Sequence, residues 1–410
     1  MKHNHSLIQA IEQTGVKFFQ DFTKFKGEKA DGLTVDHTGD LNLSSIASTG
    51  YFLSSLVIGV SQGYLKRDLA IKQAITTLTT LRDHVPHYHG FFSHFVNIHT
   101  GERHKKSEYS TIDSALAFNG ILTVDQYFKD PAIHQLSESI LGRVNWDILI
   151  HQRQGKTHFY MAYNPDADGD YVNGKPGYIH HWSMFAEQIM MYVMYAAVAK
   201  DQTLALKLYE DFERKLVTYK QASYYYTPGN TLFVYQYPQC WLDLKNMKDR
   251  QGINWFENTR QAIYGHYQLS RDMVKTYPTF GNHYFGFTAS YGRKGYQVSS
   301  ALPNVMNKLD HDGSVATNAM IGSLYHAPEI ALPAVEQLKK DQRLWDERYG
   351  FINAFNDDKP VWLSSRWLGI DKGLELLMAN AYLHHDVMDA YMHHPLIQKG
   401  MKVLQWKKNI

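Results

Sequence analysis

The sequence predicts an all-α protein whose helices are arranged as a toroid or a solenoid. Apolar side chains recur at helical spacing through most of the chain, and the first such stripe consists of Ile8, Ile11, Val16, Phe19 and Phe22. The alternation typical of strands is scarce, and residues 231–237 are its best example. The helical segments come roughly in pairs but show no repeat of fixed period, which argues against the standard solenoids.

Further helices are expected, in order, at residues 44–62, 67–83, 110–128, 132–150, 181–199, 201–219, 254–276, 314–324, 328–341 and 370–384. The long connections between them are dense in aromatic residues, glycine and histidine, at 84–107, 157–180, 221–252, 277–313 and 350–368. Long irregular segments in a compact protein are usually functional or disordered, and these are too aromatic for disorder. In a toroid they would collect at one end and wall a cleft.

Composition favours one domain and a neutral, polar substrate. The chain has 410 residues but only 12 prolines, and no stretch resembles a linker, so we expect a single domain over residues 1–410. Lysine and arginine total 42 against 40 acidic residues. This balance offers no basic surface for nucleic acid and no attraction to an anionic membrane.

Aromatic residues make up 14% of the chain, and their flat faces stack on sugars as readily as they fill large cores. Cys240 is the single cysteine, so an intrachain disulfide is excluded. The first residues lack an apolar run of signal-peptide length, and the longest apolar stretch, 189–199, is too short to span a bilayer. A cytoplasmic protein is expected.

Two acids stand at the start of the helix expected at 110–128. Ser110 has the position of an N-cap, and Asp113 that of the acid three residues into the helix, which would stabilise it through its dipole and its free N–H groups. Alternatively, Glu108 and Asp113 lie at the mouth of a cleft as catalytic or sugar-binding acids. The spacing leaves both interpretations open.

Glu187 begins a strongly apolar segment that continues with Ile189, Met190 and Met191. A carboxyl group among so many apolar neighbours should be partly desolvated, which raises its pKa and suits it to donate a proton. The alternative is an exposed glutamate on a helix.

No metal site is complete, so neither a metal nor another cofactor is expected. Residues 164–170 resemble the first half of a calcium loop, but the twelfth position is Lys175, where a bidentate glutamate is needed. The 22 histidines include clusters at 84–89, 180–181 and 384–385, yet no HExxH motif is present.

Several short segments, taken together and in order, resemble one family, the bacterial glucoamylase-like domain proteins. They are residues 45–51, 58–64, 90–95, 108–113, 182–187, 240–243, 252–258, 286–290, 312–316, 327–329, 349–355 and 368–373. The family includes endo-β-1,2-glucanases and domains associated with cyclic β-1,2-glucan synthesis. The resemblance covers most of the chain.

The resemblance implies an (α/α)₆ toroid of six inner and six outer helices, with a sugar cleft at one end. It also implies an inverting, metal-free glycoside hydrolase acting on oligo- or polysaccharides, with one carboxylic acid and one carboxylate base. Glu187 matches the position of the general acid. Asp113 is the preferred base, with Asp371 and Glu108 as rivals.

The resemblance also implies sugar contacts at Trp182, Trp241, Asp243, Tyr235, Phe287 and Tyr291. The chain departs from the family pattern where an acid is usual, at Tyr291 and in residues 364–367, and where a histidine is usual, at Gln239. A phosphorylase or transglycosylase on the same toroid, and a sugar-binding protein without catalysis, are therefore alternatives. Phosphorolysis would need a basic pocket, and only Arg293 and Lys294 are candidates for one.

Overall fold

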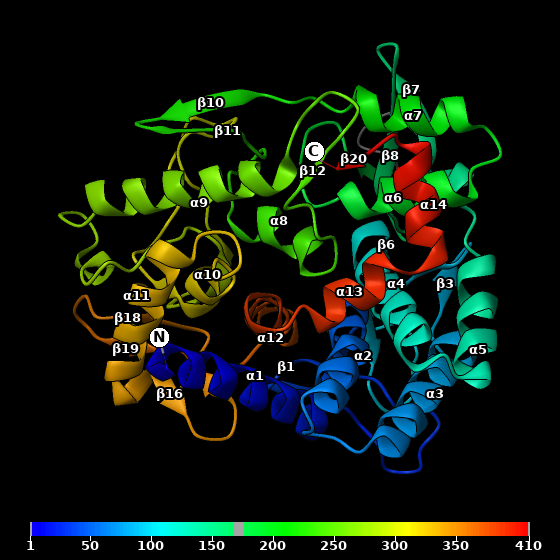
Figure 1. Ribbon diagram of the computed structural model, residues 1–410, viewed down its shortest axis with the longest axis horizontal. Helices are drawn as coiled ribbons and strands as arrows, with labels where there is room; N and C mark the ends of the chain where they lie inside the picture. Colours follow the sequence, from blue (N-terminus) through cyan, green and yellow to red (C-terminus); the bar gives the residue numbers. More distant parts are fainter. Residues whose placement is uncertain (1, 168–175, 409–410) are drawn as a thin grey trace.

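The computed structural model describes residues 2–167 and 176–408, and its helices form two concentric sets (Figure 1). The inner helices are buried on nearly all sides and are α2 (Ile46–Ser61), α4 (Thr111–Phe128), α6 (Ile189–Val198), α8 (Phe233–Gln236), α10 (Thr317–Ile321) and α12 (Gly369–Leu383). The 3₁₀ turn η2 (Tyr237–Cys240) continues α8. Helix α12 packs against both α1 and α2, so the end of the chain closes the ring on its start.

The outer helices alternate with the inner ones along the chain and bury one face each. They are α1 (Lys2–Phe22), α3 (Arg67–Asp83), α5 (Pro131–Gly142), α7 (Gln202–Asp211), α9 (Trp255–Asp272) and α11 (Pro328–Lys340). Two further helices, α13 (Asp386–Met392) and α14 (Pro395–Val403), follow the ring, and 3₁₀ turns lie at η1 (Trp146–Leu149), η3 (Pro278–Phe280) and η4 (Gln342–Leu344). Buried apolar side chains from Leu7 to Trp406 form one core cluster.

Local sequence explains how the inner helices begin and how closely they pack. Ser45 and Ser110 cap α2 and α4, each accepting a hydrogen bond from the backbone N–H three residues on. Helices α2 and α4 cross at two glycines. A Cβ on Gly50 would lie 2.4 Å from the Leu116 carbonyl oxygen, and one on Gly120 would lie 2.2 Å from the Gly50 carbonyl oxygen. Only glycine allows this close approach.

The connections form small antiparallel sheets. Three contain more than two strands: β1 (Val35–His37) with β2 (Asp40–Ser45) and β5 (Phe95–Asn97); β6 (Tyr109–Ser110), β7 (Ile150–Arg153) and β9 (Tyr178–His181) around β8 (Lys156–Tyr163); and β15 (Val315–Ala316), β18 (Ala354–Asn356) and β19 (Trp362–Leu363). The strand pairs are β3 (His87–Tyr88) with β4 (Phe91–Phe92), β10 (Leu216–Tyr219) with β11 (Ala222–Tyr225), β12 (Met247–Lys248) with β20 (Lys407–Lys408), β13 (Ala289–Gly292) with β14 (Gly295–Val298), and β16 (Trp345–Asp346) with β17 (Gly350–Phe351).

The all-α prediction is confirmed, with differences in individual elements. The strand expected at 231–237 is wrong, because Phe233–Gln236 forms α8. The helix expected at 181–199 begins only at Ile189, since the preceding residues leave strand β9 through a turn. Within the described part of the chain, no helix is both long and apolar enough to cross a membrane.

Candidate active site

A cavity of about 360 Å³ lies at the end of the ring where α4, α6 and α12 begin. Its wall is built from segments that are far apart in the sequence, and it consists of Asp36, His37, His94, Phe95, Ile112, Asp113, Leu116, Glu187, Phe233, Tyr237, Tyr291, Tyr296, Leu368 and Ile370. Three carboxyl groups and two imidazoles therefore face a space of the size of a small ligand, between aromatic rings. Such a combination of apolar walls and a few polar groups is typical of a binding or active site.

Glu187 lies on this wall, in the turn that leads into α6. The sequence placed it on a helix face, but α6 begins at Ile189 and Gln188 is the residue before it. Burial raises the pKa of Glu187 to about 8, and the nearby charge of Asp113 adds to this shift. The expected desolvation is present, and at neutral pH Glu187 holds its proton.

Asp113 both belongs to the start of α4 and faces the cavity. Its backbone N–H donates to the Ser110 Oγ at 3.2 Å, which is the cap contact expected from the sequence. The Ser110 hydroxyl in turn donates to Asp113 Oδ2 at 2.6 Å. Oδ1 faces His94 Nε2 at 3.5 Å. The two interpretations of this acid are therefore compatible, because one carboxyl oxygen joins the cap and the other meets the cavity.

His94 connects Asp113 to Glu108. Its Nδ1 lies 2.8 Å from Glu108 Oε1, on the opposite side of the ring from Asp113. Burial alone would lower the pKa of His94, but Asp113, Glu108 and Asp36 outweigh burial and raise it to about 9. Burial is the largest single effect on the pKa of Glu108 and would raise it, but the hydrogen bond and the charge of His94, with smaller contributions from a backbone hydrogen bond and from Arg103, together lower this pKa. Glu108 is thus the ion-pair partner of a charged histidine and does not line the cavity.

Asp371 lies in the first turn of α12, beneath the cavity wall. It is 2% exposed, and its carboxylate accepts hydrogen bonds from Asn353 Nδ2 at 2.5 Å and from the Tyr237 hydroxyl at 3.3 Å. Burial raises the pKa of Asp371 to about 7, with the Asn353 hydrogen bond opposing this and the charge of Glu375 adding to it. Tyr237, which does line the cavity, is the link between Asp371 and the open space.

Asp36, His37 and His94 are wall residues to which the sequence assigned no role. Asp36 and His37 belong to β1, and burial raises the pKa of Asp36, with His37 and His94 opposing the shift. No local motif marks β1, and its place beside β2, in one sheet with β5, brings it to the cavity. His94 lies in residues 90–95, one of the segments that carry the family resemblance, and this resemblance was the only feature of the sequence that pointed to it.

Of the six predicted sugar contacts, Tyr291 alone lines this cavity. Four lie in the core: Trp182 donates to Thr111 Oγ1 at 3.1 Å, Trp241 donates to Ser54 Oγ at 2.9 Å, Tyr235 donates to Asn230 Oδ1 at 2.7 Å, and Phe287 is packed against Phe280. Their exposed fractions are between 0% and 6%. Of these rings, Trp182 links its segment to α4 and Trp241 links its segment to α2.

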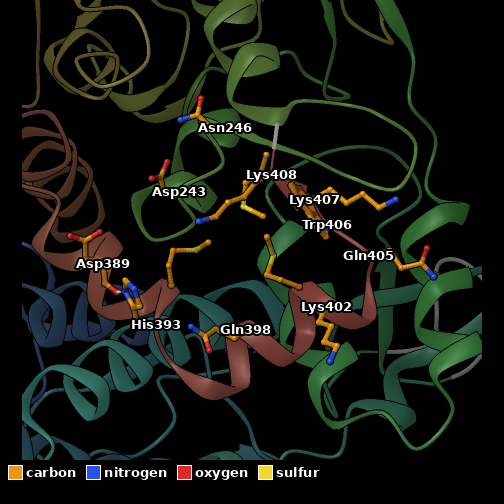
Figure 2. Close-up of a pocket in the computed structure, with 13 residues that line it drawn as sticks. Asp243, Asn246, Asp389, His393, Gln398, Lys402, Gln405, Trp406, Lys407 and Lys408 are labelled. Carbon is orange, nitrogen blue, oxygen red and sulfur yellow. Dashed lines mark hydrogen bonds between the residues drawn. The ribbon is translucent and has the colours of Figure 1, made fainter. Parts of the chain in front are cut away.

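Asp243, the sixth, lies on a different cavity of about 880 Å³ (Figure 2). It accepts a hydrogen bond from the Tyr325 hydroxyl at 2.9 Å. Figure 2 shows Asp243 and Asp389 on one side of this space and Trp406 and Gln405 on the other. No wall residue is common to the two cavities, so the structure does not bring Asp243 together with Glu187.

The half calcium loop proposed at 164–170 reaches into residues 168–175, which lie outside the described residues. Of its described part, Asn164 and Asp166 bind Arg103, at 2.8 and 2.7 Å. Among residues 2–167 and 176–408, no group of three or more histidine, cysteine or acidic side chains is placed to hold a metal ion.

Fold and cavity together define a class of protein, the glucoamylase-like (α/α)₆ toroids with acids gathered where the inner helices begin. Residues 179–395, more than half of the chain, match the family model Glycoamylase, described as "Putative glucoamylase". The chain belongs to this family, and the resemblance found in the sequence is confirmed.

Known proteins agree with this assignment. An exo β-1,2-glucooligosaccharide sophorohydrolase (non-reducing end) of Parabacteroides distasonis is 22% identical over 438 aligned residues, covering 98% of this chain but 58% of that protein. The chain thus spans little more than half the length of this relative. An endo-β-1,2-glucanase of Chitinophaga pinensis, solved with sophorotriose and glucose, has a TM-score of 0.83 at 21% identity, over 99% of both chains. A β-1,2-glucanase of P. distasonis has a TM-score of 0.82 at 19% identity, over 98% of this chain and 60% of its own. At these identities the structures establish the shared toroid.

Proposed function

We propose that the protein is a glycoside hydrolase that cleaves β-1,2-linked glucans or glucooligosaccharides with inversion at the anomeric carbon. The observation that carries the proposal is the pair Glu187 and Asp113, two carboxyl groups on the wall of one cavity, of which Glu187 has a pKa of about 8. The names of the related proteins support the β-1,2 linkage. The single core cluster supports one domain over residues 1–410.

In this mechanism Glu187 protonates the oxygen of the leaving sugar, since it holds a proton at neutral pH. Asp113 accepts a proton from the water that attacks the opposite face of the sugar. His94 Nε2 lies 3.5 Å from Asp113 Oδ1 and helps to position this carboxyl group. An inverting enzyme leaves room for that water, so its two carboxyl groups lie about 6.5–9.5 Å apart, whereas those of a retaining enzyme lie about 5–5.5 Å apart.

Proton NMR of fresh product from β-1,2-glucooligosaccharides tests this proposal. We expect new reducing ends that first appear as the α-anomer, because inversion of a β-linkage gives that product. First appearance of the β-anomer would show retention and reject the acid–base assignment. Binding without any release of sugar would instead identify a carbohydrate-binding protein.

The pH dependence of kcat/KM should have an alkaline limb near pH 8. Glu187 must be protonated to act as the acid, and its pKa is about 8, so activity falls as pH rises through this value. Rates on β-1,2-glucooligosaccharides between pH 5 and about 10 measure the limb. The residual activity of Glu187→Gln should lack it, because the amide does not titrate. A limb that persists unchanged in this variant would assign it to another group.

Chelation should leave activity unchanged. Two carboxyl groups can carry the reaction without a Lewis acid, and the sequence provides no complete ligand set. The measurement is the rate of sugar release after dialysis against EDTA, compared with a sample to which the metals are returned. Loss on chelation and recovery with zinc or calcium would contradict the prediction, and residues 164–170 would be the first segment to test.

A further inference from the structure

Stacked on a residue of the cavity wall lies an arginine that forms no ion pair with any acid of the described residues. Arg366 is half-buried, and its guanidinium lies 4.6 Å from the ring centre of Tyr291, a residue of the cavity wall. Within residues 2–167 and 176–408, this guanidinium makes no hydrogen bond and no ion pair, so its five N–H donors are unused by the protein.

Arg366 is held in place by its neighbours. The backbone of the next residue pairs with Thr38, since the Thr38 N–H donates to the Trp367 carbonyl at 3.0 Å and the Trp367 N–H to Thr38 Oγ1 at 3.1 Å. On the side of Gly39 there is no room for a side chain, because a Cβ on this residue would lie 2.6 Å from Arg366 Nε. The guanidinium is therefore confined between Gly39 and the Tyr291 ring.

Tyr291 is fixed equally well and joins Arg366 to the cavity. Its backbone N–H donates to Asn353 Oδ1 at 2.8 Å, and its ring meets His37 edge-on, with ring centres 5.6 Å apart. His37 and Tyr291 both line the cavity. A ligand that extends from the cavity past these two rings would reach Arg366. A planar, pre-positioned set of donors binds oxygen acceptors with little loss of side-chain freedom.

We propose that Arg366, stacked on Tyr291, binds hydroxyl and ring oxygens of the sugar unit at the mouth of the cavity and so determines how tightly oligosaccharides bind. This inference rests on the proposed function. The ligand class is a neutral oligosaccharide, which offers acceptor oxygens and requires no charge on the protein. Arg366 lies beside the reacting centre and not in it, so it contributes to binding of the substrate and of the transition state alike.

Steady-state kinetics on β-1,2-glucooligosaccharides tests the proposal. For Arg366→Ala we expect KM to rise about 10-fold or more with kcat within about 2-fold, as when a hydrogen bond from a charged donor is lost. Tyr291→Ala should also raise KM, and added to Arg366→Ala it should raise KM little further, because the two residues act as one unit. Arg348→Ala is the matched control, since Arg348 also stacks on a tyrosine, Tyr349, at 5.1 Å, but Tyr349 does not line the cavity as Tyr291 does.

An unchanged KM for Arg366→Ala, an effect as large for Arg348→Ala, or fully additive losses in the double variant would each overturn the inference. If Arg366→Ala does not fold, Arg366→Lys replaces it, because lysine keeps the charge but not the planar donors. Calorimetry on the Glu187→Gln background separates the two proposals. Oligosaccharide binding that weakens about 10-fold with Arg366→Ala supports this inference even if the wild-type protein proves to hydrolyse another linkage.

Discussion

Glu187→Gln should lower kcat on β-1,2-glucooligosaccharides by about 10² or more, the usual loss when general-acid catalysis is removed. The amide keeps the size of the side chain in its turn before α6 but cannot supply a proton to the leaving oxygen. KM should change little, since the lost interaction belongs to the transition state. Rates of reducing-sugar release by the purified variant measure the effect.

Two comparisons make this result specific to proton donation. Aryl glucosides with good leaving groups, if accepted, should lose less activity, because they need less protonation. Glu257→Gln is the matched control, since Glu257 lies in the first turn of α9 and outside the cavity wall. Equal losses on both substrates, or activity near that of the wild type, would return Glu187 to a structural role.

Asp113→Asn should lower kcat by about 10²–10⁴, the range observed for a lost general base. Asparagine can still accept the Ser110 hydrogen bond, so the start of α4 should persist and the melting temperature should fall little. Asp389→Asn, a change in the first turn of α13 on the other cavity, is the matched control. The combination of a large kinetic loss with an intact fold is the expected signature.

Asp371→Asn distinguishes the preferred base from its rival. Asp371 is buried and held by Asn353 and Tyr237, so its replacement should lower the melting temperature, while the folded protein retains more activity than Asp113→Asn does. If Asp371→Asn keeps its melting temperature and loses as much kcat as is expected for Asp113→Asn, the role of the base moves to Asp371.

Helical periodicity predicted the longer helices well. The boundaries of α2, α3, α4, α11 and α12 agree with the sequence to within a few residues. The periodicity failed at 231–237, where apolar residues alternate as in a strand, but Phe233–Gln236 form one turn of an inner helix. Four residues are too few to show a helical period, so such a short helix cannot be distinguished from a strand by its pattern.

Two acids of the candidate site could be predicted because they stand next to apolar helices in the sequence. Glu187 and Asp113 could be named because each acid adjoins an apolar helix, and such positions are desolvated or capped. Trp241 and Tyr235 could not be assigned to core or cavity, since a large ring fills either equally well. Asp36 could not be found at all, because its proximity to His94 depends on tertiary packing between segments distant in the chain.

The closed ring also determines when the cavity can form during synthesis of the chain. The cavity wall begins with Asp36 and ends with Leu368 and Ile370, at the start of the inner helix that packs against α1 and α2. A nascent chain that has emerged from the ribosome only as far as α11 holds Glu187 and Asp113 but lacks this last part of the wall. The cavity wall is therefore complete only once α12 has been made and packs against α1 and α2, the helices made first.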